Sequence, residues 1–158
     1  MTDDNGTTRK KRPPYGAEHA ANEIEHADGP DGVQNGERYV VADALLSESG
    51  GLWADQDGRN MHVVDQALGS GEAALRLVRQ AFGDEVEVSW FWNSCQGHYA
   101  EVASEADGMI RQGHASGRTL ALSIVAAAMR YRIAEPVPAA SIPPPRNVSL
   151  RVVSSTGR

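Results

Sequence analysis

The spacing of apolar side chains predicts two long helices in the middle of the chain. From Asn60 onward, apolar or small residues recur at alternating intervals of three and four positions, which places them along one face of a helix. This first series ends at Phe82, directly before Gly83, and glycine commonly follows the last residue of a helix. The series consists of Met61, Val64, Leu68, Gly71, Leu75, Val78 and Phe82.

A second series with the same spacing follows. If the helix is unbroken from about Asn93, it has about 42 residues and a length of about 63 Å. Pro136 ends it, because proline disfavours helical geometry in the residue before it, Glu135. The series consists of Tyr99, Val102, Ala106, Met109, Gly113, Ser116, Leu120, Ile124, Ala127, Tyr131 and Ala134.

The segment between the two series, residues 86–93 (VEVSWFWN), is expected to be the turn that joins the helices. Val86 and Val88 alternate with polar residues, so a strand is the alternative interpretation of this segment. Gly108, Gly113 and Gly117 permit a kink between the two halves of the second helix. Together these patterns predict an all-α fold, an antiparallel helical hairpin.

The composition changes on both sides of the hairpin, which we assign to residues 59–135. Residues 1–38 contain almost no large apolar side chain and are expected to form a disordered N-terminal arm. Residues 39–58 are expected to contain a short helix or strand and a turn. Residues 136–158 carry five prolines and are expected to form an extended or irregular tail.

A foldable region of about one hundred residues is small for a lone core, so we expect pairing with another chain. The second helix is longer than the first, and its C-terminal half carries Leu120, Ile124 and Ala127. We predict that these three side chains are buried against a partner chain or against residues 39–46.

The formal net charge is −6 at pH 7, and the one basic run, residues 9–12, is short. The sequence therefore does not favour nucleic acid as a partner. In a secretory signal peptide an apolar region follows the basic run, and this sequence has none there. No apolar run in the sequence approaches the length needed to cross a bilayer.

The sequence predicts no metal, no cofactor and no enzymatic activity. Cys95 and His98 have the spacing of two metal ligands, but His114 is too far from them on the predicted helix to join one site. Structural zinc usually needs four ligands. Glu101 and Glu105 are expected to be a solvated pair on one helical face. The sequence contains no glycine-rich phosphate loop and no nucleophile elbow.

Three aromatic residues in a row, Trp90, Phe91 and Trp92, occupy the expected turn. A stacking platform for nucleic acid has basic residues between its aromatic residues, and this segment has none. We therefore expect a hydrophobic cap or a contact with another protein, in which large aromatic side chains are common anchors.

The end of the second helix carries a further motif. Tyr131 and Glu135 are four residues apart and would share one helical face. A helical hairpin with a tryptophan-containing turn, followed by Tyr-x-x-x-Glu, resembles the WXG-type proteins of the type VII (ESX) secretion system, with the EspC-like excreted factors as the nearest branch. The resemblance covers about residues 61–135 and is best in Cys95-x-x-x-Tyr99 and in residues 117–135. The turn, however, lacks the Trp-x-Gly sequence.

This resemblance implies a secreted, non-enzymatic protein that pairs with another helical hairpin or with itself. It implies that Tyr131 and Glu135 form an export signal read by the secretion ATPase, and that Trp90 and Trp92 contribute to recognition at the turn. The alternative is a cytosolic helical adaptor or regulator whose basic arm binds nucleic acid or an acidic partner.

Overall fold

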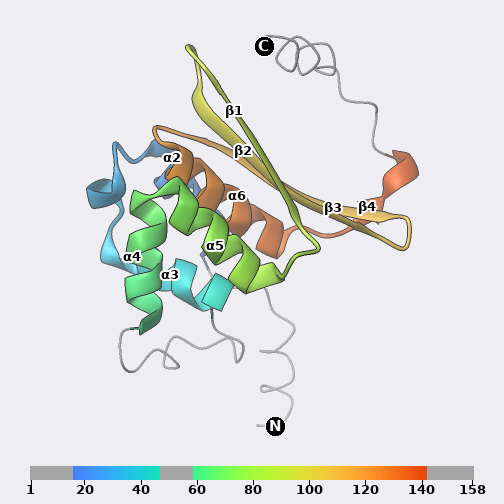
Figure 1. Ribbon diagram of the computed structural model, residues 1–158, viewed down its shortest axis with the longest axis horizontal. Helices are drawn as coiled ribbons and strands as arrows, with labels where there is room; N and C mark the ends of the chain where they lie inside the picture. Colours follow the sequence, from blue (N-terminus) through green and yellow to red (C-terminus); the bar gives the residue numbers. More distant parts are fainter. Residues whose placement is uncertain (1–15, 47–58, 142–158) are drawn as a thin grey trace, which may run out of the picture.

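The computed structural model describes residues 16–46 and 59–141, in which helices pack on one face of a four-stranded antiparallel sheet (Figure 1). The all-α helical hairpin predicted from the sequence is therefore wrong, and the fold is mixed α/β. The helices, in chain order, are α2 (Ala17–His26), η1 (Pro30–Gly32), α3 (Asn35–Leu46), α4 (Arg59–Gly69), α5 (Gly71–Phe82), α6 (Leu120–Ile133) and η3 (Ala139–Ser141). The strands are β1 (Glu87–Asn93), β2 (Gly97–Ala106), β3 (Met109–Gly117) and β4 (Val137–Pro138).

The first predicted helix is present as two helices, α4 and α5. Ser70 separates them with an extended backbone, and its side chain accepts a hydrogen bond from the main-chain N–H of Ala73 at 3.3 Å. This is the usual N-cap arrangement. The end of α5 was predicted correctly, since Gly83 has a φ of 81° and its N–H donates to the carbonyl oxygen of Arg79.

The first half of the second predicted helix consists of strands. Residues 86–93 were expected to be a turn, and the alternative interpretation as a strand is confirmed by β1. Asp107 and Gly108 join β2 to β3 in a two-residue turn with φ values of 55° and 74°. Positive φ at both positions is what a tight hairpin turn with the twist of the sheet requires. The expected kinked helix at Gly108 is therefore wrong, because the chain reverses there.

The N-terminal boundary also differs from the one expected at residue 38. Helix α2 and the start of α3 lie within the segment that was expected to be a disordered arm. Helix α2 contributes four buried side chains to the core, those of Ala17, Ala20, Ala21 and Ile24. Residues 1–15 and the predicted turn at 47–58 lie outside the described residues, as does the tail from residue 142.

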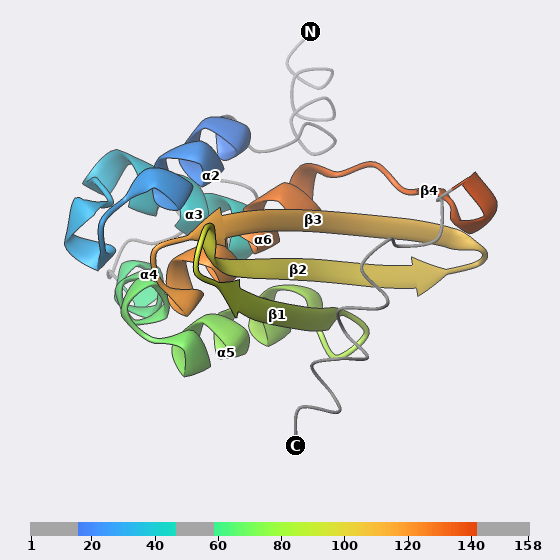
Figure 2. The same ribbon diagram turned by 90° about the horizontal axis from the view of Figure 1, so that it is seen from above.

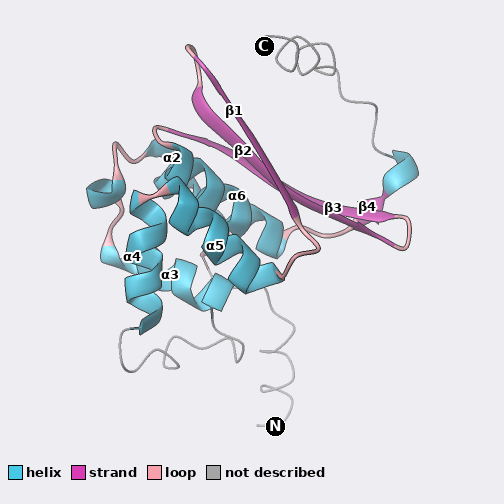
Figure 3. Ribbon diagram, viewed as in Figure 1, coloured by secondary structure: helices cyan, strands magenta, loops and turns pink. Residues whose placement is uncertain are grey.

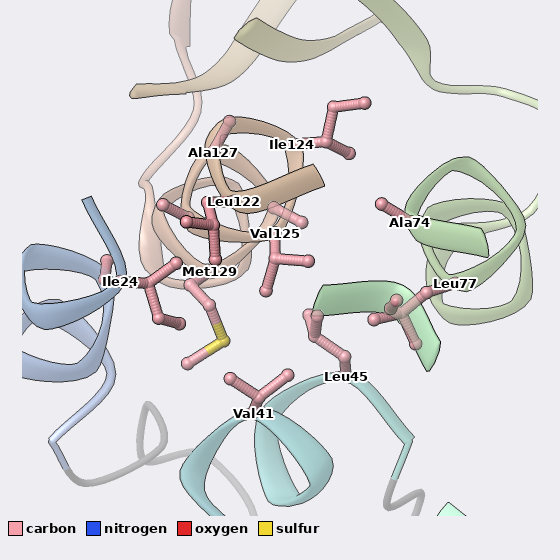
Figure 4. Close-up of a cluster of buried hydrophobic side chains, with 14 of the residues drawn as sticks. Ile24, Val41, Leu45, Ala74, Leu77, Leu122, Ile124, Val125, Ala127 and Met129 are labelled. Carbon is pink, nitrogen blue, oxygen red and sulfur yellow. The ribbon is translucent and has the colours of Figure 1, made fainter. Parts of the chain in front are cut away.

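Helix α6 is the centre of the molecule. Every residue from 121 to 129 is buried, which is typical of a helix that is surrounded on all sides. The sheet lies on one side of α6, and side chains from α2, α3 and α5 point toward it from the other sides (Figure 4). Those labelled are Ile24, Val41, Leu45, Ala74 and Leu77, which lie around Leu122, Val125 and Met129 of α6, whereas Ala127 points toward the strands.

The sheet is longer than the helical layer. Figure 3 shows that the β1–β2 hairpin extends past the helices at one end and that the β2–β3 turn extends past them at the other. Side chains near the two ends of the sheet therefore have less helix beneath them than those above α6.

Candidate interaction site

The strand register assigns each side chain of the sheet to one of two faces. Residues directly opposite one another across an antiparallel pair point to the same face, and successive residues alternate. Trp90 lies opposite Ala100, which lies opposite Ala115, and both alanines are buried against the helices. We call this the helix-side face. Phe91 and Tyr99 point to the opposite face, which we call the outer face, and no helix of the described residues covers it (Figure 2).

Three consecutive aromatic side chains of β1 are exposed. Trp90 is 48% exposed, Phe91 46% and Trp92 63%. The two tryptophans point to the helix side, but they lie on the edge strand, toward the end of the hairpin that projects past the helices. We call Trp90, Phe91 and Trp92 the aromatic edge. Large exposed aromatic side chains are common anchors of protein interfaces, and here they lie on both faces of one edge strand.

Aromatic rings continue from the aromatic edge across the outer face. The ring centroids of Phe91 and Tyr99 are 4.9 Å apart at an interplanar angle of 29°, and those of Tyr99 and His114 are 6.0 Å apart at 23°. Burial raises the pKa of Tyr99, and the neighbouring carboxylate of Glu101 raises it further, so the phenol stays neutral. Glu87 also points to the outer face, which gives this surface both aromatic and acidic groups.

Among residues 16–46 and 59–141, β1 pairs with β2 alone and is an edge strand. An unpaired strand edge presents a row of main-chain N–H and C=O groups to which another strand can be added. In the part of the chain that the structure describes, β1 is therefore the strand with the most aromatic side chains, and it leaves a long edge open for pairing.

The opposite edge of the sheet is occupied. The first two residues of β3 pair with β4, a two-residue strand that includes Pro138. Farther along, the guanidinium of Arg130 donates to the carbonyl oxygen of His114 at 3.1 Å, and the N–H of Ser116 donates to the carboxylate of Glu25 at 2.8 Å. Side chains of α2 and α6 thus take the places that another strand would need.

Arg130 and Glu25 belong to an ion-pair cluster that joins α6 to α2. Arg130 lies 2.7 Å from Glu25 and 2.8 Å from Glu18. Burial raises the pKa of Glu25, but hydrogen bonds from Arg130 and Ser116 and the charge of Arg130 lower it by more, so its net pKa is below the usual range. The cluster stabilises the charged carboxylate and closes the β3 edge.

The structure places Tyr131 in the core. It is 5% exposed, its hydroxyl is 2.6 Å from that of Ser104, and its ring packs edge-on against Phe82 with centroids 4.7 Å apart. Helix α6 ends at Ile133, so the expectation that Tyr131 and Glu135 share one helical face is wrong. Glu135 is exposed beyond the helix. A receptor that bound the Tyr131 ring would first have to remove it from the core.

The three residues predicted to meet a partner lie against this chain's own elements. Ile124 and Ala127 are completely buried, and Leu120 is half-buried and packs against the core. The turn residues Trp90 and Trp92 are on a strand rather than in a turn. Among the predicted site residues, the structure therefore leaves only these two tryptophans and Glu135 exposed.

The residues weighed as metal ligands do not converge. Cys95 is exposed in the β1–β2 loop, His98 is on the helix-side face and His114 is on the outer face. In residues 16–46 and 59–141, no group of three or more histidine, cysteine or acidic side chains could hold a metal ion. In the same part of the chain, every helix is too short or too polar to cross a membrane.

Comparisons of the chain with protein-family models, with curated proteins and with solved structures found no match. The resemblance to WXG-type proteins therefore depends on the short motifs alone, and export by type VII secretion stays a prediction. Sequence reasoning missed the row formed by Phe91, Tyr99 and His114, because Tyr99 was assigned to a helix. The Asp107–Gly108 dipeptide between alternating residues was the signal that could have revealed it.

Proposed function

We propose that this domain is a non-enzymatic protein-interaction module that binds an extended segment of a partner along the free edge of β1. The single observation that carries this proposal is that three consecutive aromatic residues of an edge strand, Trp90, Phe91 and Trp92, have exposed side chains. Main-chain hydrogen bonds to the edge would provide affinity, and the aromatic side chains would select the partner's residues.

The charge of the site favours a particular partner. Glu85 and Glu87 lie at the start of β1, and Glu101 is on the neighbouring strand. An acidic surface with aromatic rings suits a segment that alternates apolar and basic residues, because a guanidinium or ammonium group can approach both a carboxylate and a ring face.

A random-peptide display library selected on the full chain tests this proposal. We expect enriched peptides with apolar residues at every second position, whose binding shifts the amide signals of β1 in NMR spectra. Trp92→Lys should weaken their binding at least about tenfold, since a truncated aromatic anchor often contributes 2 kcal/mol or more.

Tyr39 provides the matched control. It is an aromatic side chain that is 47% exposed, but it lies on α3, which is separated from the sheet by α6 (Figure 1). Tyr39→Lys should leave peptide binding unchanged. Enrichment of peptides that bind equally well to the Trp92→Lys chain, or no enrichment at all, would refute the proposal.

A further inference from the structure

We propose that, when no partner segment is bound, β1 of a second copy of this chain occupies the free edge of β1, antiparallel to it, with the Trp90 residues of the two copies opposite one another. Each copy then covers the edge of the other, and this pairing competes with the partner segment. The inference rests on the proposed function, because it names an occupant of the same edge and a way in which binding there is regulated.

The turn between β2 and β3 determines which residues of β2 are hydrogen bonded to which neighbouring strand. Asp107 and Gly108 form a two-residue turn, so Ala106 and Met109 on either side of it are hydrogen bonded to each other. Bonded positions alternate along an antiparallel pair of strands. The even-numbered residues of β2 therefore bond to β3, and the odd-numbered residues bond to β1.

The same alternation identifies the main-chain groups of β1 that face the free edge. Odd-numbered residues of β1 lie opposite odd-numbered residues of β2, as Phe91 lies opposite Tyr99, and bond to them. The N–H and C=O groups of Val88, Trp90 and Trp92 therefore point outward. These are the same three residues whose apolar side chains belong to the helix-side face. A second strand that bonds to this edge thus meets apolar side chains at every bonded position.

β1 is complementary to itself when the pairing is centred on Trp90. Trp90 is the middle residue of the strand, so this register pairs all seven residues of each copy. Val88 then lies opposite Trp92 of the second copy, and only apolar side chains meet on the helix-side face. A shift of the register in either direction leaves residues at the ends of both strands unpaired.

The charges of β1 are compatible with this register. Glu87 is the one charged residue of the strand, and it lies opposite Asn93 of the second copy. Like charges directly opposite one another would destabilise a strand pair, and this register avoids them. The two copies can therefore pair without an ion pair between them.

The pairing also covers the end of the hairpin that projects past the helices. Trp92 lies toward this end and is 63% exposed (Figure 3). Its neighbour in the second copy is Val88, which packs against the core of that copy. One strand from each copy gives a contact at the small end of protein interfaces, where complexes are weak and transient. A partner segment that binds more tightly can therefore displace the second copy.

Cysteine pairs on the outer face test the register. Ser89 lies opposite Phe91 of the second copy in a non-hydrogen-bonded pair, with Cα atoms about 4.5 Å apart, which allows a disulfide bond. With Cys95 replaced by serine, a mixture of Ser89→Cys and Phe91→Cys chains should form disulfide-linked dimers at least about ten times faster than either chain alone. Each chain alone is the matched control, because its two thiols lie two residues apart along the strands, with Cα atoms about 8 Å apart. Equal rates, or a higher rate in either chain alone, would overturn the proposal.

Amide hydrogen exchange tests the unmodified chain. When about nine-tenths of the chains are dimeric, exchange at Val88, Trp90 and Trp92 should slow about tenfold, because their N–H groups are free only in the monomer. The N–H groups of Ser89 and Phe91 bond to β2 in both states, so their exchange should slow less. Unchanged exchange at the first three amides, or a chain that stays monomeric at every concentration, would overturn the proposal.

Failure of this inference is distinguishable from failure of the proposed function. Peptides selected on the full chain should dissociate the dimer and should bind more tightly at protein concentrations too low for dimers. Each copy has a formal net charge of −6, so added salt should favour the dimer, whereas it should weaken the binding of a basic peptide. Peptide binding by a chain that never dimerises would refute the pairing alone, and a dimer that no selected peptide dissociates would refute the competition for one edge.

Discussion

Gly113 shows at the level of one residue why α6 can lie directly on the sheet. A Cβ atom at this position would be 2.1 Å from the main-chain nitrogen of Tyr131 and 2.6 Å from the carbonyl oxygen of Ala127. Both are backbone atoms, so no side-chain rotation could relieve the clash. The absence of a side chain at Gly113 thus sets the distance between helix and strand.

Gly113→Ala should therefore lower the free energy of unfolding by at least about 3 kcal/mol, because helix and sheet must separate to admit the methyl group. Urea unfolding followed by circular dichroism measures this difference. Gly36→Ala is the control, since nothing lies within 4 Å of a Cβ atom there and alanine favours a helix. Equal effects of the two substitutions would contradict the role assigned to Gly113.

Glu25 predicts how stability depends on pH. Its folded-state pKa is below the usual value of 4.5, so its stabilising contribution is complete above that pH. The contribution is lost as the pH falls through the folded-state pKa, because protonation then neutralises the carboxylate that Arg130 and Ser116 bind.

Glu25→Gln should destabilise the protein at neutral pH by about 1 to 2 kcal/mol, the range for a hydrogen bond to a charged group. The difference from the unmodified protein should shrink as the pH is lowered below 4.5, as measured by urea unfolding at a series of pH values. Glu72→Gln, in an exposed pair with Arg76, should change little at any pH. A difference for Glu25→Gln that stays constant with pH would show that its charge is not involved.

At the level of elements, the sequence predicted α5 and the end of α6 more reliably than the strands. Gly83 and Pro136 are strong local signals for the end of a helix. Helix α5 ends at Phe82, directly before Gly83, and α6 ends at Ile133, shortly before Pro136. The series from Tyr99 to Ser116 was misleading because half of its members are small. Alanine, serine and glycine fit a period of two as well as a period of three and four, so only the turn at Asp107 distinguished hairpin from helix.

The two residues of the suggested export signal should behave differently because they belong to different environments. Tyr131→Ala removes a buried ring from α6 and should lower the free energy of unfolding by about 3 kcal/mol or more. Glu135→Ala changes an exposed residue after the helix and should have an effect within about 0.5 kcal/mol.

Tyr131→Phe separates packing from hydrogen bonding at this position. It keeps the ring against Phe82 and removes the contact with Ser104, so it should lower stability by about 1 kcal/mol. Thermal unfolding of the three variants checks this order. If Tyr131→Ala were as mild as Glu135→Ala, the ring would not be part of the core, and its availability as a signal would have to be reconsidered.

At the level of the whole molecule, composition concealed the N-terminal part of the fold. Residues 17–26 contain one large apolar side chain, Ile24, and the segment therefore has the composition of a disordered arm. In the structure its alanines allow α2 to pack closely on α6, and Glu18 and Glu25 pair with Arg130. These contacts join positions more than one hundred residues apart, which local pattern cannot predict.

At the level of the whole molecule, the exposed strand also affects how one copy meets another. An unprotected edge with apolar side chains is a site of sheet-to-sheet association, and β1 carries only one charged residue, Glu87, along its length. We therefore expect the full chain to associate through β1, to an extent that increases with concentration.

Trp92→Lys should give a monomer, because a lysine on an edge strand opposes pairing with another strand. Sedimentation velocity of the full chain and of the variants over a range of concentrations measures the association. Tyr39→Lys is the control and should leave the association in place, since α3 does not contribute to the edge. Association that continued in the Trp92→Lys chain would place the contact elsewhere on the molecule, and an unmodified chain that stayed monomeric at every concentration would show that the β1 edge does not pair with other copies.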